Sequence, residues 1–139
     1  MIILAVDLGD VRTGLAVCDE GEILASPAGV IHESSQKKLL PAIKQIAEDH
    51  KSRLIVVGHP RNMDGSFGAR AVKCEKFAQQ LQNFTRIKVE LFDERVTTKA
   101  AGQKLNDLNI RGKRRKSIID EMAAVEIMQG FLDYRKSRI

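Results

Sequence analysis

The sequence predicts an α/β fold: a mixed five-stranded sheet, made of a three-strand antiparallel meander plus parallel strands, with helices on both faces. Three short segments rich in β-branched residues indicate strands: Ile2–Asp7, Arg53–Gly58 and Ile87–Phe92. The first is apolar from Ile2 to Val6, which is typical of a central strand covered on both faces. Helical segments separate these strands, and strands joined through helices pair in parallel.

The antiparallel part of the sheet is predicted from the segment after the first strand. Gly14–Asp19 and Glu22–Ala25 have the pattern of a hairpin that turns at Glu20-Gly21. A further stretch, Gly29–His32, is expected to add another antiparallel strand. These segments therefore complete the predicted meander.

Four helices are predicted from apolar spacing and capping residues, at about 37–49, 68–81, 97–108 and 117–134. The segment Arg111–Lys116, just before the last helix, is expected to be a basic loop. The chain has 139 residues and shows no internal repeat and no linker. We therefore expect a single domain over residues 1–139.

The charge balance is basic, because 23 Lys and Arg stand against 18 Asp and Glu, for a net charge of +5. This excess favours a polyanionic partner such as nucleic acid. The chain has no Trp and one Tyr. Stacking of aromatic side chains on bases is therefore not expected to be the main mode of binding.

The two cysteines, Cys18 and Cys74, lack the spacing of a metal site or a disulfide framework. We expect both to be buried, reduced thiols. The apolar start is too short for a signal peptide, and no window approaches the length of a membrane span. The expectation is a cytoplasmic protein with no membrane partner.

Asp7 is the first candidate functional residue. It ends a strand that is otherwise wholly apolar, and open α/β sheets bind their ligands at the carboxyl ends of strands. Gly9 and Gly14 follow, so the chain can turn tightly and leave room beside the acid. The competing interpretation is a turn residue that caps the strand exit.

Two further acids are predicted to approach Asp7. One is Asp93 or Glu94, which directly follow the strand Ile87–Phe92. The other is Asp120, near the start of the last helix, and its neighbour Glu121 is the rival. Asp120 lies within about 60° of the apolar stripe of this helix, at about 100° per residue. The stripe consists of Ala123, Ala124, Ile127, Phe131 and Tyr134.

A carboxylate on the core-facing side of a helix requires compensation, by an arginine or by a cation, because an unpaired buried charge costs several kcal/mol. Three converging acids with hard oxygen ligands favour Mg²⁺, or Mn²⁺, over zinc. Such a site beside a polyanion-binding surface suggests metal-assisted hydrolysis of phosphodiester bonds.

Basic residues near these acids are candidates for binding the nucleic acid, with a solvated loop or ordinary surface salt bridges as the competing interpretation. The run before Asp120 could deliver a phosphate backbone to the site. The candidate residues are Arg12, Arg61, Arg95, Lys113, Arg114, Arg115 and Lys116.

Four segments, in order along nearly the whole chain, resemble motifs of the YqgF/RuvX family. They are Asp7–Ala16, Val57–Gly65, Phe92–Thr98 and Lys116–Ala124. One departure is His59, where the family usually has Leu. A histidine there could contact phosphate or tune the water of a metal ion, or it could be a tolerated loop residue.

The resemblance implies a ribonuclease H-like fold and a cytoplasmic hydrolase of ester bonds, a nuclease that matures the 5′ end of small-subunit rRNA. It also implies that Asp7, Glu94 and Asp120 form the acidic site, which selects Glu94 over Asp93. The partner is then an rRNA precursor or, for a Holliday junction resolvase, branched DNA. The protein is expected to be a monomer or a homodimer, since symmetric cleavage of a junction needs two copies.

Two other classes of function stay open at this point. Asp7-Leu8-Gly9 with Thr13-Gly14 also resembles the phosphate loop of actin-like ATPases and sugar kinases, which clamp a nucleotide between two such domains. The third class is an RNA-binding ribosome-assembly factor without catalytic activity.

Overall fold

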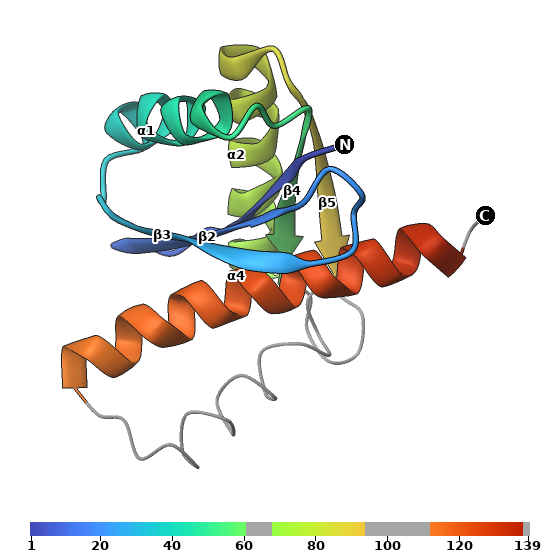
Figure 1. Ribbon diagram of the computed structural model, residues 1–139. Coiled ribbons are helices and arrows are strands. Elements are labelled where there is room, and N and C mark those ends of the chain that lie inside the picture. The colour runs from blue at the N-terminus through green and yellow to red at the C-terminus, as the bar shows by residue number, and fades with distance from the viewer. Residues whose placement is uncertain (61–67, 94–111, 138–139) are drawn as a thin grey trace.

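The computed structural model describes residues 1–60, 68–93 and 112–137, except for the side chains of 112–118 and 120 (Figure 1). Within these ranges the chain forms one five-stranded sheet between two layers of helices. No helix in them is both long and apolar enough to cross a membrane.

The sheet has the predicted mixed topology. Its strands are β1 (Ile3–Asp7), β2 (Arg12–Cys18), β3 (Ala25–His32), β4 (Leu54–His59) and β5 (Lys88–Asp93). They lie in the order β3-β2-β1-β4-β5. The first three pair antiparallel, whereas β4 is parallel to β1 and β5 is parallel to β4. The ends of β1, β4 and β5 therefore meet at one edge, which we call the carboxyl edge, and their starts meet at the amino edge.

The predicted hairpin is wrong in its second arm. Glu22–Leu24 is not part of a strand, and β3 is one strand of eight residues that begins at Ala25 and includes the predicted stretch Gly29–His32. The reason lies in Asp19, whose Oδ1 accepts hydrogen bonds from the main-chain amides of Ile23, at 2.7 Å, and Leu24, at 2.9 Å. These bonds hold the chain in a wide turn before β3 begins.

The helices cover both faces of the sheet, as predicted. On one face lie α1 (Gln36–Asp49) and α2 (Ala69–Thr85), and on the other lies α4 (Gly112–Ser137) (Figure 1). The predicted basic loop Arg111–Lys116 is wrong, because α4 already begins at Gly112. Lys and Arg are good helix formers and the run contains no proline, so nothing in it opposes a helix. The helix predicted at 97–108 lies outside the described residues.

Alternation along the strands divides the core into two clusters. In β1, Leu4 and Val6 pack toward α1 and α2, whereas Ile3 and Ala5 pack toward α4. In the central strands, Ile3–Val6 of β1 and all of β4 are buried, as expected for strands covered on both faces. Cys18 and Cys74 are both buried and form no disulfide, as predicted.

The apolar stripe of α4 is largely as predicted. Its buried residues are Ala123, Ala124, Ile127, Met128, Phe131 and Leu132. Tyr134 was expected on this stripe but is 45% exposed, with its ring centroid 6.0 Å from that of Phe92.

Candidate functional site

Asp7 is the last residue of β1 and lies at the carboxyl edge, half-buried. It shares the face of Ile3 and Ala5, so alternation directs its side chain toward the α4 side of the sheet. Its partner across the β1–β2 ladder is Gly14. Glycine has no side chain, so no Cβ of β2 stands directly opposite Asp7 on this face.

The turn that follows Asp7 is held from outside by α2. The guanidinium Nη2 of Arg70 donates a hydrogen bond of 2.9 Å to the carbonyl oxygen of Leu8. Lys73 Nζ lies 2.9 Å from Asp10 Oδ1, and this ammonium lowers the pKa of the Asp10 carboxyl. Within the turn, a Cβ added at Gly9 would overlap the carbonyl oxygen of Arg12. The backbone after Asp7 is thus held by Gly9 and by the hydrogen bond from Arg70, whereas Lys73 pairs with an exposed carboxylate.

The end of β5 discriminates between the two acids left open by the sequence pattern. Phe92 faces α4, since its ring lies 5.7 Å from that of Phe131. Alternation therefore turns Asp93 to the α2 face, away from the face of Asp7. Glu94, the candidate selected by the family resemblance, lies outside the described residues.

The third candidate acid is on the helix that covers this same face. Asp120 lies in α4, one turn before the fully buried Ala124, so its backbone belongs to the core-facing side of the helix. Its side chain lies outside the described part of the structure. The rival Glu121 is half-buried, about 100° further round the helix.

The candidate basic residues are described only in part. Arg12 begins β2, is half-buried, and shares the α4 face with Gly14 two residues further on, next to the position of Asp7. The backbones of Lys113, Arg114, Arg115 and Lys116 form the first turns of α4, and their side chains are not described. Arg61 and Arg95 also lie outside the described residues.

His59 is the last residue of β4 and not a loop residue. It is 4% exposed and faces α2, where its Nε2 lies 3.5 Å from Glu75 Oε1. Its side chain therefore points away from the face of Asp7, which argues against direct contact with a substrate phosphate bound there.

A metal site cannot be assembled from the described side chains alone. No group of three or more His, Cys, Asp or Glu side chains among them could hold an ion. Of the three predicted ligands, Asp7 is the one whose side chain is described. Its carboxylate oxygens suit Mg²⁺ or Mn²⁺, and its place at a sheet edge opposite a glycine fits a bound ion.

Sequence reasoning missed Arg70 and Lys73, which hold the turn after Asp7. Arg70 contacts a main-chain carbonyl 62 residues away, and such a contact leaves no periodic or motif signal. The direction of the His59 side chain could have been predicted, because His59 continues the alternation by which Ile55 and Val57 face α2.

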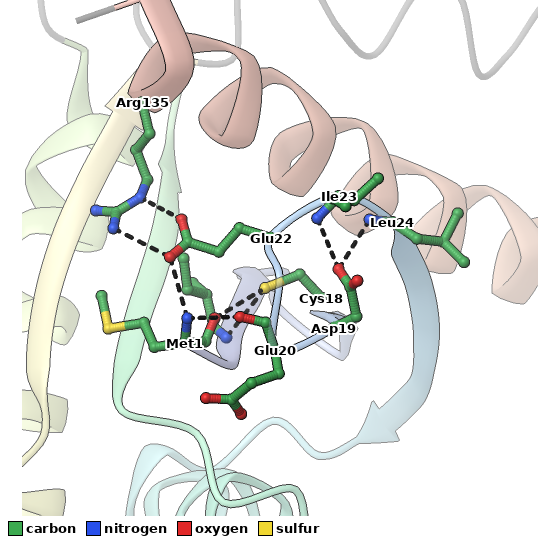
Figure 2. A network of polar contacts seen from close by, with 9 residues as sticks. Met1, Cys18, Asp19, Glu20, Glu22, Ile23, Leu24 and Arg135 are labelled. Atoms are coloured by element: carbon green, nitrogen blue, oxygen red, sulfur yellow. Dashed lines mark hydrogen bonds and ion pairs between the residues drawn. The ribbon is translucent and has the colours of Figure 1, made fainter. Parts of the chain in front are cut away.

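A second polar cluster lies at the amino edge, between the β2–β3 turn and the end of α4 (Figure 2). The Glu22 carboxylate accepts a hydrogen bond of 2.7 Å from Arg135 Nε and one of 3.1 Å from the amino group of Met1. A cavity of about 620 Å³ lies beside it, lined in part by Glu90 and Tyr134. The polar groups of this cluster bind one another, as expected for contacts that stabilise the fold.

Sequence comparisons find similar proteins along nearly the whole chain. The profile of the family described as "RuvX: Holliday junction resolvase" matches residues 1–134. A Carboxydothermus hydrogenoformans protein named "Putative pre-16S rRNA nuclease" is 40% identical over 135 residues, covering 97% of this chain and 98% of that protein. A protein of the same name from Agathobacter rectalis is 39% identical over 137 residues, covering 96% of each.

Solved structures show the fold. A Thermus thermophilus RuvC structure matches with a TM-score of 0.59 at 13% identity, covering 99% of this chain and 97% of that one. The fowlpox virus Holliday junction resolvase matches with a TM-score of 0.58 at 13% identity, covering 96% and 99%. The fold is thus the ribonuclease H-like fold that the resemblance implied. From the full-length profile match and the close relatives, this chain belongs to the RuvX family.

Proposed function

We propose that this protein is a metal-dependent nuclease that hydrolyses phosphodiester bonds and processes the 5′ end of pre-16S rRNA in the cytoplasm. The observation that carries the proposal is Asp7, a carboxylate at the end of a buried central strand that faces a glycine across the ladder. The family and the names of the relatives supply the substrate class.

In this proposal Asp7, Glu94 and Asp120 hold Mg²⁺ or Mn²⁺. Two observations support the set: Asp7 and α4, which carries Asp120, belong to the same face of the sheet, and alternation turns Asp93 away from that face. A divalent ion bound there would activate water for attack on phosphorus and neutralise charge on the leaving oxygen. Carboxylates are the ligands that such ions prefer.

The protein's cations would hold the nucleic acid. Arg12 is the best supported, because it shares the face of Asp7 and begins the neighbouring strand. Its guanidinium can bind a phosphate through two parallel hydrogen bonds, which fixes the phosphodiester relative to Asp7. We assign the same task to Arg61, Arg95 and the basic first turns of α4, at Lys113, Arg114, Arg115 and Lys116.

The test is Asp7→Asn, which removes a metal-binding charge with almost no change in shape. We expect the rate of cleavage of a labelled pre-16S rRNA fragment in Mg²⁺ to fall by more than about 100-fold. This loss exceeds the 10- to 100-fold loss that is typical when a residue that only orients a metal ligand is changed. Binding of the same RNA in EDTA and the thermal midpoint of unfolding should stay close to those of the unaltered protein.

Asp10→Asn is the matched control, because Asp10 lies on the same turn but is exposed and paired with Lys73. It should cleave normally. Full activity of Asp7→Asn would remove the proposed mechanism. RNA binding without cleavage in any divalent metal, by the unaltered protein, would instead favour an assembly factor without catalytic activity.

The second candidate function is resolution of Holliday junctions, which the description of the family profile favours. A side-by-side assay with a pre-16S rRNA fragment and a four-way DNA junction separates the two. Cleavage of the junction at symmetric positions would also require a dimer, which size-exclusion chromatography with light scattering would detect.

A further inference from the structure

Two strained backbone positions at the amino edge carry basic side chains. Outside glycine, the described residues adopt positive φ at Glu22, with φ 57°, Lys51, with φ 58°, and Arg86, with φ 64°. Glycine adopts this left-handed conformation at much lower cost, and helices often end in it. Lys51 and Arg86 lie where α1 and α2 end, so glycine would adopt the backbone conformation at either position with less strain.

The side chain explains the strained position at Glu22 but not at the other two. Glu22 is bound by Arg135 and by the amino group of Met1. By contrast, Lys51 and Arg86 are exposed, and their side chains make no ion pair or hydrogen bond within the described residues. No described side-chain contact therefore accounts for a basic residue at either position.

Two more cations join them at the same edge. Arg53 comes just before β4, and Lys88 begins β5, where it is the register partner of Leu54. Both are exposed. Beside them is a hollow of about 650 Å³ lined by Gln82, Asn83, Arg86, Ile87 and Lys88, which offers amide and cationic donors. We call Lys51, Arg53, Arg86 and Lys88 the amino-edge cations.

The two acids at the end of α1 form no ion pair with this group within the described residues. At the end of α1, Glu48 Oε1 lies 3.9 Å from Lys44 Nζ, and Asp49 Oδ1 accepts a hydrogen bond of 2.8 Å from Gln45. The helix dipole favours cations at helix ends and is a partial reason for Lys51 and Arg86. It gives no reason for Arg53 and Lys88, which stand at the starts of strands.

We propose that the amino-edge cations bind the phosphate backbone of the nucleic acid whose cleavage is proposed at Asp7. This inference rests on the proposed function and adds a second surface that contacts the same nucleic acid. The six residues of β4 separate the two edges by about 20 Å. At about 3.4 Å per base pair, this distance corresponds to about six base pairs of duplex. The phosphates bound here are therefore remote from the scissile bond.

Arg86→Gly tests the proposal, because it removes the charge while relieving the strained backbone. The probe is a labelled RNA hairpin with a stem of about 20 base pairs, long enough to reach both edges, titrated in EDTA at several salt concentrations. We expect weaker binding and a plot of log K against log salt that is shallower by about 0.9 for each lost phosphate contact. The thermal midpoint should not fall.

Lys88→Gln is the second variant, since it changes a strand residue and leaves helix ends untouched. The control is Lys38→Gln at the far end of α1 from Lys51, which should leave the salt dependence as it is. A probe stem of about four base pairs, too short to span the edges, should bind Arg86→Gly and the unaltered protein equally.

The outcomes separate this inference from the proposed function. If both variants bind the long probe with an unchanged slope, the inference is overturned, whereas loss of cleavage in Asp7→Asn still supports the nuclease. If Arg86→Gly lowers the thermal midpoint and Lys88→Gln binds normally, Arg86 acts on the fold alone and the inference is again overturned.

Discussion

The turns at the two ends of β2 both contain acids but are built in different ways. The turn from Leu8 to Val11 follows Asp7 and is held by α2, through Arg70 to a main-chain carbonyl and Lys73 to Asp10. The turn from Asp19 to Leu24 is held largely by its own acids: Asp19 binds two amides of the turn, and Glu22 binds Arg135 of α4.

This difference shows why an acid near a strand end is, by itself, weak evidence for a functional site. Asp19 and Glu22 are explained by contacts that close and anchor their turn, and hydrogen bonds from those contacts lower the pKa of both carboxyls. At the other end, the outside contacts of α2 fix the backbone on either side of Gly9.

The largest expected effect comes from changing Gly9, the glycine of the turn after Asp7. In Gly9→Ala the new Cβ would overlap the Arg12 carbonyl oxygen, so the backbone must shift, at a cost of about 1 to 3 kcal/mol of unfolding free energy. Because Asp7 and Arg12 flank this turn, cleavage of pre-16S rRNA should fall as well. Urea unfolding followed by circular dichroism, with a cleavage assay, measures both.

Gly21→Ala is the matched control in the other turn. A Cβ there would have its nearest neighbour, Asp19 Oδ2, at 3.5 Å, an ordinary contact. We expect stability within about 0.5 kcal/mol of the unaltered protein and normal cleavage. Equal losses from the two substitutions would show that the turns do not differ as described.

Arg70→Met sharpens the comparison at the active end. It keeps the aliphatic stem but releases the Leu8 carbonyl, so the peptide after Asp7 loses its outside support. By analogy with residues that orient metal ligands, cleavage should fall about 10- to 100-fold. The loss should appear in the maximal rate and in the Mg²⁺ concentration needed, with RNA binding in EDTA unchanged.

Two further variants distinguish positioning from general destabilisation. Arg70→Lys, which retains a donor, should recover part of the activity. Lys73→Met loses only its ion pair with the exposed Asp10 and should cleave normally. A thermal midpoint that falls in step with the activity in all three variants would contradict a positioning role for Arg70.

Much of the fold follows from local pattern, and the exceptions have physical reasons. Buried β-branched runs predicted β1 and β4, because strands covered on both faces must be apolar throughout. Alternation of apolar and polar residues predicted β5, which is an edge strand. The start of β3 was misjudged since the bonds from Asp19 to the main chain compete with strand pairing in a way that composition does not reveal. The start of α4 was misjudged because charge was interpreted as a loop signal, although Lys and Arg favour helices.

The candidate site was predictable where a residue's position in a strand decides its role. Asp7 ends an apolar strand, and alternation alone gives its face and that of His59. Arg70 could not be predicted, because its partner is a carbonyl that the fold brings near from a distant part of the chain. The assignments of Glu94 and Asp120 stay predictions, which the variants of Asp7 and Arg70 bear on only through activity.

The smallest effect is expected at the other end of β2, from Glu22→Gln. The carboxylate of Glu22 accepts hydrogen bonds from Arg135, at 2.7 Å and 3.4 Å, and from the amino group of Met1. Its side chain is 23% exposed, so solvent weakens these contacts, and the loss at neutral pH should be about 1 kcal/mol. Cleavage should be unaffected, because the turn lies at the opposite edge from Asp7.

The pH dependence of this loss gives the sharper measurement. The hydrogen bond from Arg135 is the main cause that holds the pKa of Glu22 below its ordinary value of 4.5. A carboxyl with a lowered folded pKa contributes stability that is present above its unfolded pKa and is lost as the pH falls through the folded pKa. The stabilities of Glu22→Gln and the unaltered protein should therefore differ at pH 7 and converge below pH 4.5. Glu20→Gln is the control, because only the main-chain oxygen of Glu20 takes part in the cluster, and its stability should equal that of the unaltered protein at every pH. If the difference in stability between Glu22→Gln and the unaltered protein stayed constant with pH, the charge of Glu22 would not hold the turn.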